Sequence, residues 1–304
     1  EAMTLLYAVR DREQKKNNIC KFFVSEDIFP QTLSVLKTRS EPIGIDLVIG
    51  NIEDFDFDSN FFGALIQYPG ASGEIKDIKS FISKCISNNI KTAVASDILS
   101  LVLLESPGKI GADVVVGTTQ RFGIPLGYGG PHAGYFATKE EYKRNIPGRI
   151  IGVSIDADGN KALRMALQTR EQHIKRDKAT SNICTAQVLL AVMAGMYAVY
   201  HGPNGLKEIS QKVHFNAITL KKELELLGLK QLNSSFFDTI RINAKRSEVE
   251  KIAEEKEINF YYPSDEIISI TINETTTIDD INDIIYVFSK FTNKPFEKID
   301  KTEN

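Results

Sequence analysis

Cysteine and histidine are scarce in this sequence of 304 residues, which contains three cysteines and four histidines. The cysteines are odd in number and far apart, at Cys20, Cys85 and Cys184. This distribution argues against a disulfide framework and predicts free thiols in a reducing compartment. No two histidines have the spacing of zinc ligands, and no Cys-x-x-Cys motif accompanies them. The sequence therefore predicts no metal site.

An excess of charge of either sign is also missing. The 37 Lys and Arg residues nearly balance the 40 Asp and Glu residues, which leaves a formal net charge of -3. Without a basic excess, the sequence gives no reason to expect a nucleic-acid partner. A hydrophobic content of 42% is ordinary for a globular protein.

One long apolar run, "ICTAQVLLAVMAGMYAVY" at residues 183–200, raises the question of a membrane span. Polar or small residues interrupt it, and no flanking cluster of Lys or Arg supports insertion. We therefore expect no membrane span, but a helix buried in a large domain or at a subunit interface. The opening residues, "EAMTLLYAVRDR", have a helical pattern without an N-cap residue, which predicts a piece of a longer chain.

Short apolar runs alternate with helical patterns over the first half of the sequence. Most of these runs are apolar on both faces, which is typical of a parallel sheet covered by helices on each side. The pattern predicts an α/β layered domain. Its expected strands are residues 20–24, 45–49, 63–68, 91–95, 113–117 and 132–137.

Helical patterns predominate after Ala137, and a smaller α+β unit is expected from residue 229. The helices are expected at 139–146, 161–178, 183–200 and 205–227. The smaller unit is expected to have strands at 236–242, 259–263 and 267–272, and helices at 246–257 and 277–291. The predicted domains are therefore 1–228, 229–292 and a polar tail or linker at 293–304.

The segment with the strongest signs of chemistry is "GTTQRFGIPLGYGGPHAGYFA", residues 117–137. Its glycines allow the backbone to approach another group closely. The G-x-G-x-x-G spacing of a dinucleotide site is missing, however, and no helix follows directly. The residue chemistry favours a structural histidine at His132, a solvated helix face at His173 and a buried thiol at Cys184. From residue chemistry alone, a tight turn and a functional loop both remain open.

Longer blocks of the sequence carry a resemblance to a known family. They include "LVLLESPGK" (101–109), "PGRIIGVS" (147–154), "TREQHI" (169–174) and "SNICTAQ" (181–187). Together with residues 117–137, these blocks resemble the glycine cleavage system P-protein family of pyridoxal-phosphate-dependent glycine decarboxylases. The resemblance extends to "ITINETTT" (270–277), where the family usually has an aspartate in place of Asn273.

The resemblance implies a fold type I domain of the pyridoxal-phosphate (PLP) transferases, with three layers and a mainly parallel sheet. P-proteins have two similar halves, and this chain resembles the N-terminal half or α subunit. The cofactor lysine belongs to the C-terminal half. The shared F-x-I-P-x-G-x-G-G-P pattern places Gln120 at the position of that lysine, and an amide cannot form the required Schiff base. The acidic partner of the pyridine nitrogen falls on Ala95, with Asp97 two residues further on.

The resemblance also implies that this chain has no catalytic residue and no covalent cofactor of its own. Its partner half would hold the PLP, decarboxylate glycine and pass the aminomethyl group to lipoylated H-protein within an oligomer. Residues that could line the interface or pocket are Arg121, Tyr128, Gly129, Gly130, His132, Arg170 and His173. The location would be cytoplasmic in a bacterium and the mitochondrial matrix in a eukaryote.

Two alternatives stay open at this point. The chain could be a catalytically silent scaffolding or regulatory subunit with the same fold. It could also be an independent PLP enzyme that uses another lysine, such as Lys109 or Lys139.

Overall fold

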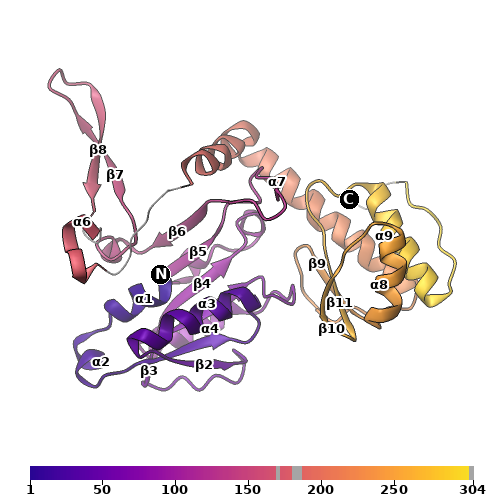
Figure 1. Cartoon of the computed structure of the whole chain (residues 1–304), viewed down its shortest axis with the longest axis horizontal. Helices are drawn as coiled ribbons and strands as arrows, with labels where there is room; N and C mark the ends of the chain where they lie inside the picture. The colour runs from indigo at the N-terminus through magenta and orange to yellow at the C-terminus, as the bar shows by residue number, and fades with distance from the viewer. Residues whose placement is uncertain (169–171, 180–186, 301–304) are drawn as a thin grey trace. The chain divides into compact units, whose positions relative to one another are not determined.

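The computed structural model describes residues 1–168, 172–179 and 187–300, in two compact units (Figure 1). The first unit contains residues 1–66, 78–95 and 105–195, and the second contains 67–77, 96–104 and 196–304. The units thus change over between Gly195 and Met196, whereas the sequence placed a boundary at residue 228. The limits 1–228, 229–292 and 293–304 stay a prediction.

The first unit is built on a six-stranded sheet with the order β2-β1-β3-β4-β5-β6 (Figure 1). Strand β1 runs parallel to β2 and β3, β4 runs parallel to β5, and β6 is antiparallel to β5. All six strands predicted from the sequence are present, and the sheet is mainly parallel. They are Lys21–Ser25 (β1), Asp46–Gly50 (β2), Phe61–Tyr68 (β3), Lys91–Ser96 (β4), Val114–Thr118 (β5) and Gly134–Thr138 (β6).

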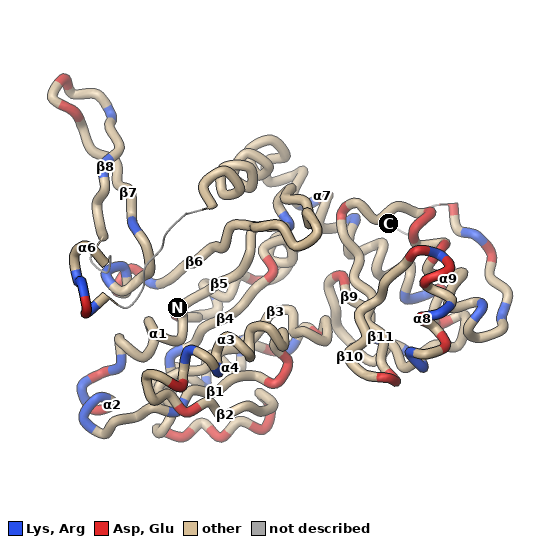
Figure 2. Tube along the Cα trace, viewed as in Figure 1, with Lys and Arg blue, Asp and Glu red and all other residues tan. Residues whose placement is uncertain are grey.

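Acidic residues accompany the edge strand β2. Asp46 begins the strand, and four carboxylates follow it in the loop to β3 (Figure 2), at Glu53, Asp54, Asp56 and Asp58. Charged side chains on an edge strand oppose unwanted pairing with another sheet. Asp46 places such a charge on β2 itself.

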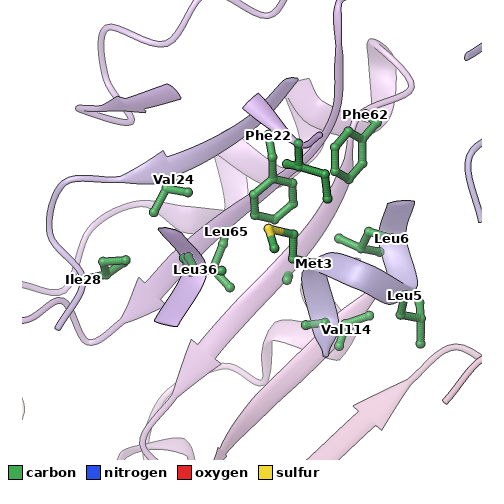
Figure 3. Close-up of a cluster of buried hydrophobic side chains, with 13 residues drawn as sticks. Met3, Leu5, Leu6, Phe22, Val24, Ile28, Leu36, Phe62, Leu65 and Val114 are labelled. Atoms are coloured by element: carbon green, nitrogen blue, oxygen red, sulfur yellow. The ribbon is translucent and has the colours of Figure 1, made fainter. Parts of the chain in front are cut away.

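Helices cover both faces of the sheet. Neighbouring residues of a strand point to opposite faces, so each strand contributes side chains to two cores. On one face Phe22 stacks on Phe62 with ring centroids 5.2 Å apart, in a core that also holds Leu5 and Leu6 (Figure 3). These two leucines belong to helix α1 (Ala2–Ala8), and Leu36 of α3 (Pro30–Ser40) joins the same core. Pro30 occupies the first turn of α3, where its missing N–H costs nothing.

The other face carries an aromatic cluster beneath helix α4 (Ile78–Ser87). Phe23 lies 4.1 Å from Phe55 and 5.9 Å from Phe81 of α4, measured between ring centroids. With helices on each side, the first unit has three layers. Cys85 of α4 is also buried, and burial, together with the charge of Asp113, raises the pKa of its thiol to about 12. The thiol therefore stays protonated at neutral pH and is a core residue.

Two short α-helices, α2 (Arg12–Lys16) and α5 (Pro107–Ile110), also precede β5 in the sequence. The side chain of Asp11 accepts a hydrogen bond from the backbone N–H of Gln14 at 2.7 Å and so caps α2. Helix α5 ends at Gly111, which has a left-handed φ of 113°. This glycine turns the chain into β5.

The structure corrects the helix that the sequence predicted at 161–178. Residues Ile150–Ile155 (β7) and Lys161–Leu167 (β8) form an antiparallel hairpin. Among the described residues of the predicted range, α-helix is confined to Gln172–Lys175 (α6), which a 3-10 turn follows. The helix expected at 139–146 is likewise reduced to a single 3-10 turn, Glu140–Tyr142. Backbone pairing between β7 and β8 thus overrides the helix propensity of the residues in β8.

A polar turn sets the pairing of this hairpin. The carboxylate of Asp156 accepts hydrogen bonds from the N–H groups of Asp158 at 2.9 Å and Asn160 at 2.8 Å. These bonds, first of all the one from Asn160, lower the pKa of Asp156. Gly159 adopts a left-handed φ of 85°. An aspartate and a glycine at these places favour a tight reversal over a helix.

A long helix, α7 (Val188–Leu226), leads from the first unit into the second. Gly202 breaks it with φ 62° and ψ -178°, directly before Pro203. The residue before a proline avoids the helical conformation, and glycine tolerates the positive φ. The two helices predicted on either side of this point are confirmed within the described residues. Gly228, with a left-handed φ of 86°, follows the second of them.

The apolar run at 183–200 was expected to be buried in a domain or at a subunit interface. Its described part begins at Gln187, and in this chain most of that part is exposed. Burial in a domain of this chain is therefore wrong for most of the described residues 187–200, of which Ala194 is buried. The large exposed side chains are Val188, Leu189, Val192, Met193, Met196, Val199 and Tyr200.

The second unit contains the predicted α+β fold. Its sheet has the order β10-β11-β9 with antiparallel pairs. The elements are β9 (Thr239–Asn243), α8 (Arg246–Glu255), β10 (Tyr261–Ser264), β11 (Ile267–Thr271) and α9 (Ile278–Thr292). The described part of the C-terminal tail is attached to α9, because the amide of Asn282 exchanges two hydrogen bonds with the backbone of Ile299, at 2.9 and 3.0 Å.

Asn273, where the resembling family usually has aspartate, organises the turn before α9. Its Oδ1 accepts hydrogen bonds from the N–H of Thr275 at 2.9 Å and from the hydroxyl groups of Thr275 and Thr276 at 2.8 and 3.1 Å. A carboxylate oxygen accepts the same bonds. The departure from the family pattern therefore leaves this turn intact.

The loop after β3 also belongs to the second unit. The carboxylate of Glu74 accepts hydrogen bonds from the backbone and hydroxyl of Ser234, both at 2.8 Å, and from the N–H of Ser235 at 3.1 Å. Gly73 has a φ of 81°, and a Cβ on it would lie 2.7 Å from the Cβ of Thr239. Only glycine fits this contact without displacement.

Candidate functional site

Gln120 lies two residues beyond the end of β5, in a single helical turn. Its backbone N–H donates to the hydroxyl of Thr118 at 3.2 Å, and its carbonyl accepts the N–H of Ile124 at 3.0 Å. The neighbouring Thr119 donates its N–H and its hydroxyl to the carbonyl of Ala133, at 2.8 and 3.0 Å. These bonds join the Gln120 turn to the residues just before β6. The turn therefore lies at the carboxyl end of β5.

The glycine loop, which we define as residues 125–132, is held in an unusual backbone conformation. Gly127, Tyr128 and Gly129 all have left-handed φ values, of 54°, 52° and 90°. The N–H groups of Gly129 and Gly130 both donate to the carbonyl of Leu126, at 3.1 and 3.0 Å. A left-handed tyrosine is unfavourable, and such conformations gather where a loop has a function.

The side chains of the glycine loop face outward. Tyr128 has a relative exposure of 110%, and Leu126 is also exposed. His132 is exposed at the start of β6, whereas Arg121, in the Gln120 turn, is partly buried. An exposed aromatic ring on a constrained loop is typical of residues that anchor a contact with another surface. The loop can therefore bind a partner, but it presents no buried catalytic group.

A buried carboxylate lies at the opposite end of β5, where the strand begins. Asp113 is buried, and its carboxylate accepts hydrogen bonds from the N–H of Thr92 at 2.8 Å, from Nζ of Lys139 at 2.7 Å and from the hydroxyl of Tyr142 at 3.3 Å. Burial, and next the charge of Asp113, raises the pKa of Tyr142, which stays protonated. Sequence reasoning missed this cluster. Its members are not neighbours in the sequence, and Asp113 was counted only as the start of a strand.

Neither alternative cofactor lysine lies beside Gln120. Lys139 follows β6 and is paired to Asp113 at the start of β5, because Val114 pairs with Thr138 in the register of the two strands. Lys109 is exposed on α5, the helix that precedes β5. Both lysines are thus on the amino side of β5, whereas Gln120 is beyond its carboxyl end.

The residues around Gln120 do not fit a covalently held PLP. The cofactor is attached through a lysine amine, which the amide of Gln120 cannot replace. Ala95, beside Val116 in the register of β4 and β5, has no acidic group for a pyridine nitrogen. The carboxylate of Asp97 instead accepts the N–H of Leu99 at 3.1 Å, within its own turn. That Gln120 occupies the lysine position stays a prediction.

The remaining candidate residues are spread over other segments. His173 is exposed on α6, and Arg170 lies outside the described residues, as does Cys184. Within the described ranges, no group of three metal-ligating side chains comes together. None of the helices in the described part of the chain combines the length and apolarity that crossing a bilayer requires.

Comparison with known proteins was made by sequence and by structure. The sequence model of the family described as glycine cleavage system P-protein matches residues 1–288. Glycine dehydrogenase (decarboxylating) from Christiangramia forsetii is 64% identical over 99% of this chain and 32% of its own length. The protein of the same name from Flavobacterium johnsoniae is 65% identical over 97% of this chain and 31% of its own length. The chain thus spans about a third of these relatives.

Solved structures show the same fold. A crystal structure of glycine decarboxylase (P-protein) in an inhibitor-bound form has a TM-score of 0.85 and 26% identity, covering 95% of this chain and 68% of that one. A cystine C–S lyase has a TM-score of 0.61 and 15% identity over 90% of this chain and 76% of its own, which shows the fold alone. A variant of this lyase has glycine covalently linked to its PLP cofactor. The predicted fold type I domain is confirmed.

Proposed function

Since the chain belongs to the glycine cleavage system P-protein family, we propose that it is the N-terminal part of a glycine dehydrogenase (decarboxylating) that carries no cofactor lysine itself. The observation that supports this most strongly is the amide of Gln120 at the carboxyl end of β5, with Lys109 and Lys139 both on the amino side. The chain then contributes a framework and contact surfaces to the enzyme.

In this proposal the remaining two thirds of the protein hold the PLP, and glycine and lipoylated H-protein react there. The PLP-bound lyase among the structural neighbours supports the cofactor for this fold. This lyase does not tell which half of a P-protein binds PLP. Our proposal that it is the other half rests on Gln120. The relatives named above are bacterial, which favours the cytoplasm among the two locations expected from the sequence.

The glycine loop is the first contact that we propose with the lysine-bearing part. Tyr128 is wholly exposed, and the left-handed residues around it hold its ring away from the first unit's core. Gly129, Gly130 and His132 continue the same exposed stretch. Arg121, His173 and Arg170 are proposed contacts of the same kind, on the family resemblance.

The exchange of labelled bicarbonate into the carboxyl group of glycine tests the proposed function. The full-length protein, loaded with PLP and mixed with lipoylated H-protein, is expected to catalyse the exchange. Residues 1–304 alone are expected to stay at background, because no lysine stands at position 120. Adding this chain to the separately produced remainder is expected to restore the exchange.

Two outcomes would contradict the proposal. Exchange by residues 1–304 alone would show that this chain holds a working cofactor site. Equal exchange by the remainder with and without this chain would instead favour the regulatory alternative. The far-UV circular dichroism of each piece serves as the control for folding.

A further inference from the structure

The β7–β8 hairpin has two unequal faces. Residues directly opposite each other in an antiparallel pair share a face, and so do alternate residues of one strand. Ile151 pairs with Met165, and Val153 pairs with Leu163. One face therefore carries five large aliphatic side chains and is called the apolar face here: Ile151, Val153, Ile155, Leu163 and Met165.

The apolar face is open in this chain. The relative exposures of its five aliphatic residues run from 41% for Met165 to 77% for Leu163. The opposite face lacks large aliphatic side chains at these positions: Ser154 is paired with Ala162, and Gly152 is paired with the charged Arg164. Contiguous exposed apolar side chains of this kind mark an interaction surface.

The hairpin also needs a covering surface for its own stability. A two-stranded hairpin is at best marginally stable in water unless it packs against something. Its two acidic residues, Asp156 and Asp158, lie at the turn (Figure 2). Among the described residues of the hairpin, the only charged one paired on the apolar face is Lys161, opposite Ile155 at the turn end of the strands. The surface that covers this face is therefore itself apolar.

We propose that the apolar face docks against the remaining part of the same full-length protein, an inference that rests on the proposed function. About two thirds of the length of the relatives lies outside this chain. A surface in the same polypeptide is present at a high effective concentration and covers the hairpin in every molecule. A second copy of the chain would cover it only above the dissociation constant of a dimer.

Hydroxyl-radical footprinting of the full-length protein tests this docking. Leu163 is 77% exposed in this chain, and Leu226, at the end of α7, is a matched leucine at 75%. Each oxidation rate is divided by the rate of the same residue in the guanidinium-unfolded protein. Leu163 is expected to be protected roughly fivefold or more, as in the core of an interface, and Leu226 to stay near the rate of an exposed leucine. A rate for Leu163 near the unfolded value would overturn the proposal, whatever Leu226 shows.

A pair of double variants of the full-length protein separates docking from damage to the hairpin. Val153→Glu with Leu163→Glu places two carboxylates on the apolar face, and Ser154→Glu with Ala162→Glu places two on the opposite face. Both pairs are directly opposed, so like-charge repulsion disturbs the strands in both variants. In the wild type, the docked face is expected to protect Met165 against oxidation by peroxide. The first variant is expected to lose this protection, and the second to keep it. Equal behaviour of the two variants would overturn the proposal.

The native mass identifies the occupant. It is expected to be the same for the wild type and the first variant. A native mass halved by that variant would assign the face to a second copy and overturn the intramolecular docking. Failure of the proposed function is distinguishable, because a wild type without glycine–bicarbonate exchange leaves the protection of Leu163 as an independent result.

Discussion

Replacing Asp113 with alanine is expected to lower the free energy of unfolding by about 3 kcal/mol, because this buried carboxylate is the acceptor of a buried backbone N–H. The carboxylate accepts hydrogen bonds from the backbone of Thr92, from Lys139 and from Tyr142. Its loss leaves the buried N–H of Thr92 without this acceptor, which carries a desolvation penalty. Equilibrium unfolding in urea, followed by circular dichroism, measures the change.

Two variants serve as controls for this prediction. Lys139→Met removes the other charge of the pair, but the lysine side chain is 40% exposed. Its loss is therefore expected to cost about 1 kcal/mol or less, as for other solvent-exposed pairs. Asp113→Asn keeps an oxygen for the N–H of Thr92 and should fall between the two. An Asp113→Ala protein that unfolds at the wild-type urea concentration would contradict this account of the cluster.

Gly73→Ala is the second substitution with a large expected effect, again about 3 kcal/mol, the sum of a left-handed alanine and a steric overlap. The new Cβ would lie 2.7 Å from the Cβ of Thr239 and 2.8 Å from its carbonyl oxygen. Backbone cannot move aside as the end of a flexible side chain can. Thermal or urea unfolding of the variant gives the loss of stability.

Gly44→Ala is the matched control for this substitution. Gly44 has a similar φ of 68°, but a Cβ there would meet nothing within 4 Å. Only the backbone conformation is then disfavoured, at about 1 kcal/mol. The difference between the two variants isolates the contact with Thr239. Equal losses would show that this contact does not hold the loop after β3 in place.

The sheet and the small α+β unit could be predicted because their sequence patterns are local and strong. Phe22 and Phe23, for example, are buried on opposite faces of β1, and a run that is apolar on both faces indicates such a strand. The β7–β8 hairpin was missed because Ala, Leu, Met and Arg in β8 favour a helix when considered alone. The turn that begins at Asp156 was the available signal.

The candidate site could be predicted only in part. The position of Gln120 followed from the family resemblance, and the structure adds its place beyond the end of β5. The pairing of Asp113 with Lys139, which are 26 positions apart, depends on the antiparallel β6 and has no local signature. The exposure of the first part of α7 was also beyond reach, because an apolar run looks the same in a core and at an interface.

Borohydride reduction of the PLP-loaded full-length protein tests the central claim most directly. Reduction makes the bond between cofactor and lysine permanent, and mass spectrometry of the digested protein then locates the labelled lysine. We expect the label outside residues 1–304 and an unlabelled peptide around Gln120. A label on a lysine of this chain, such as Lys109 or Lys139, would contradict the account.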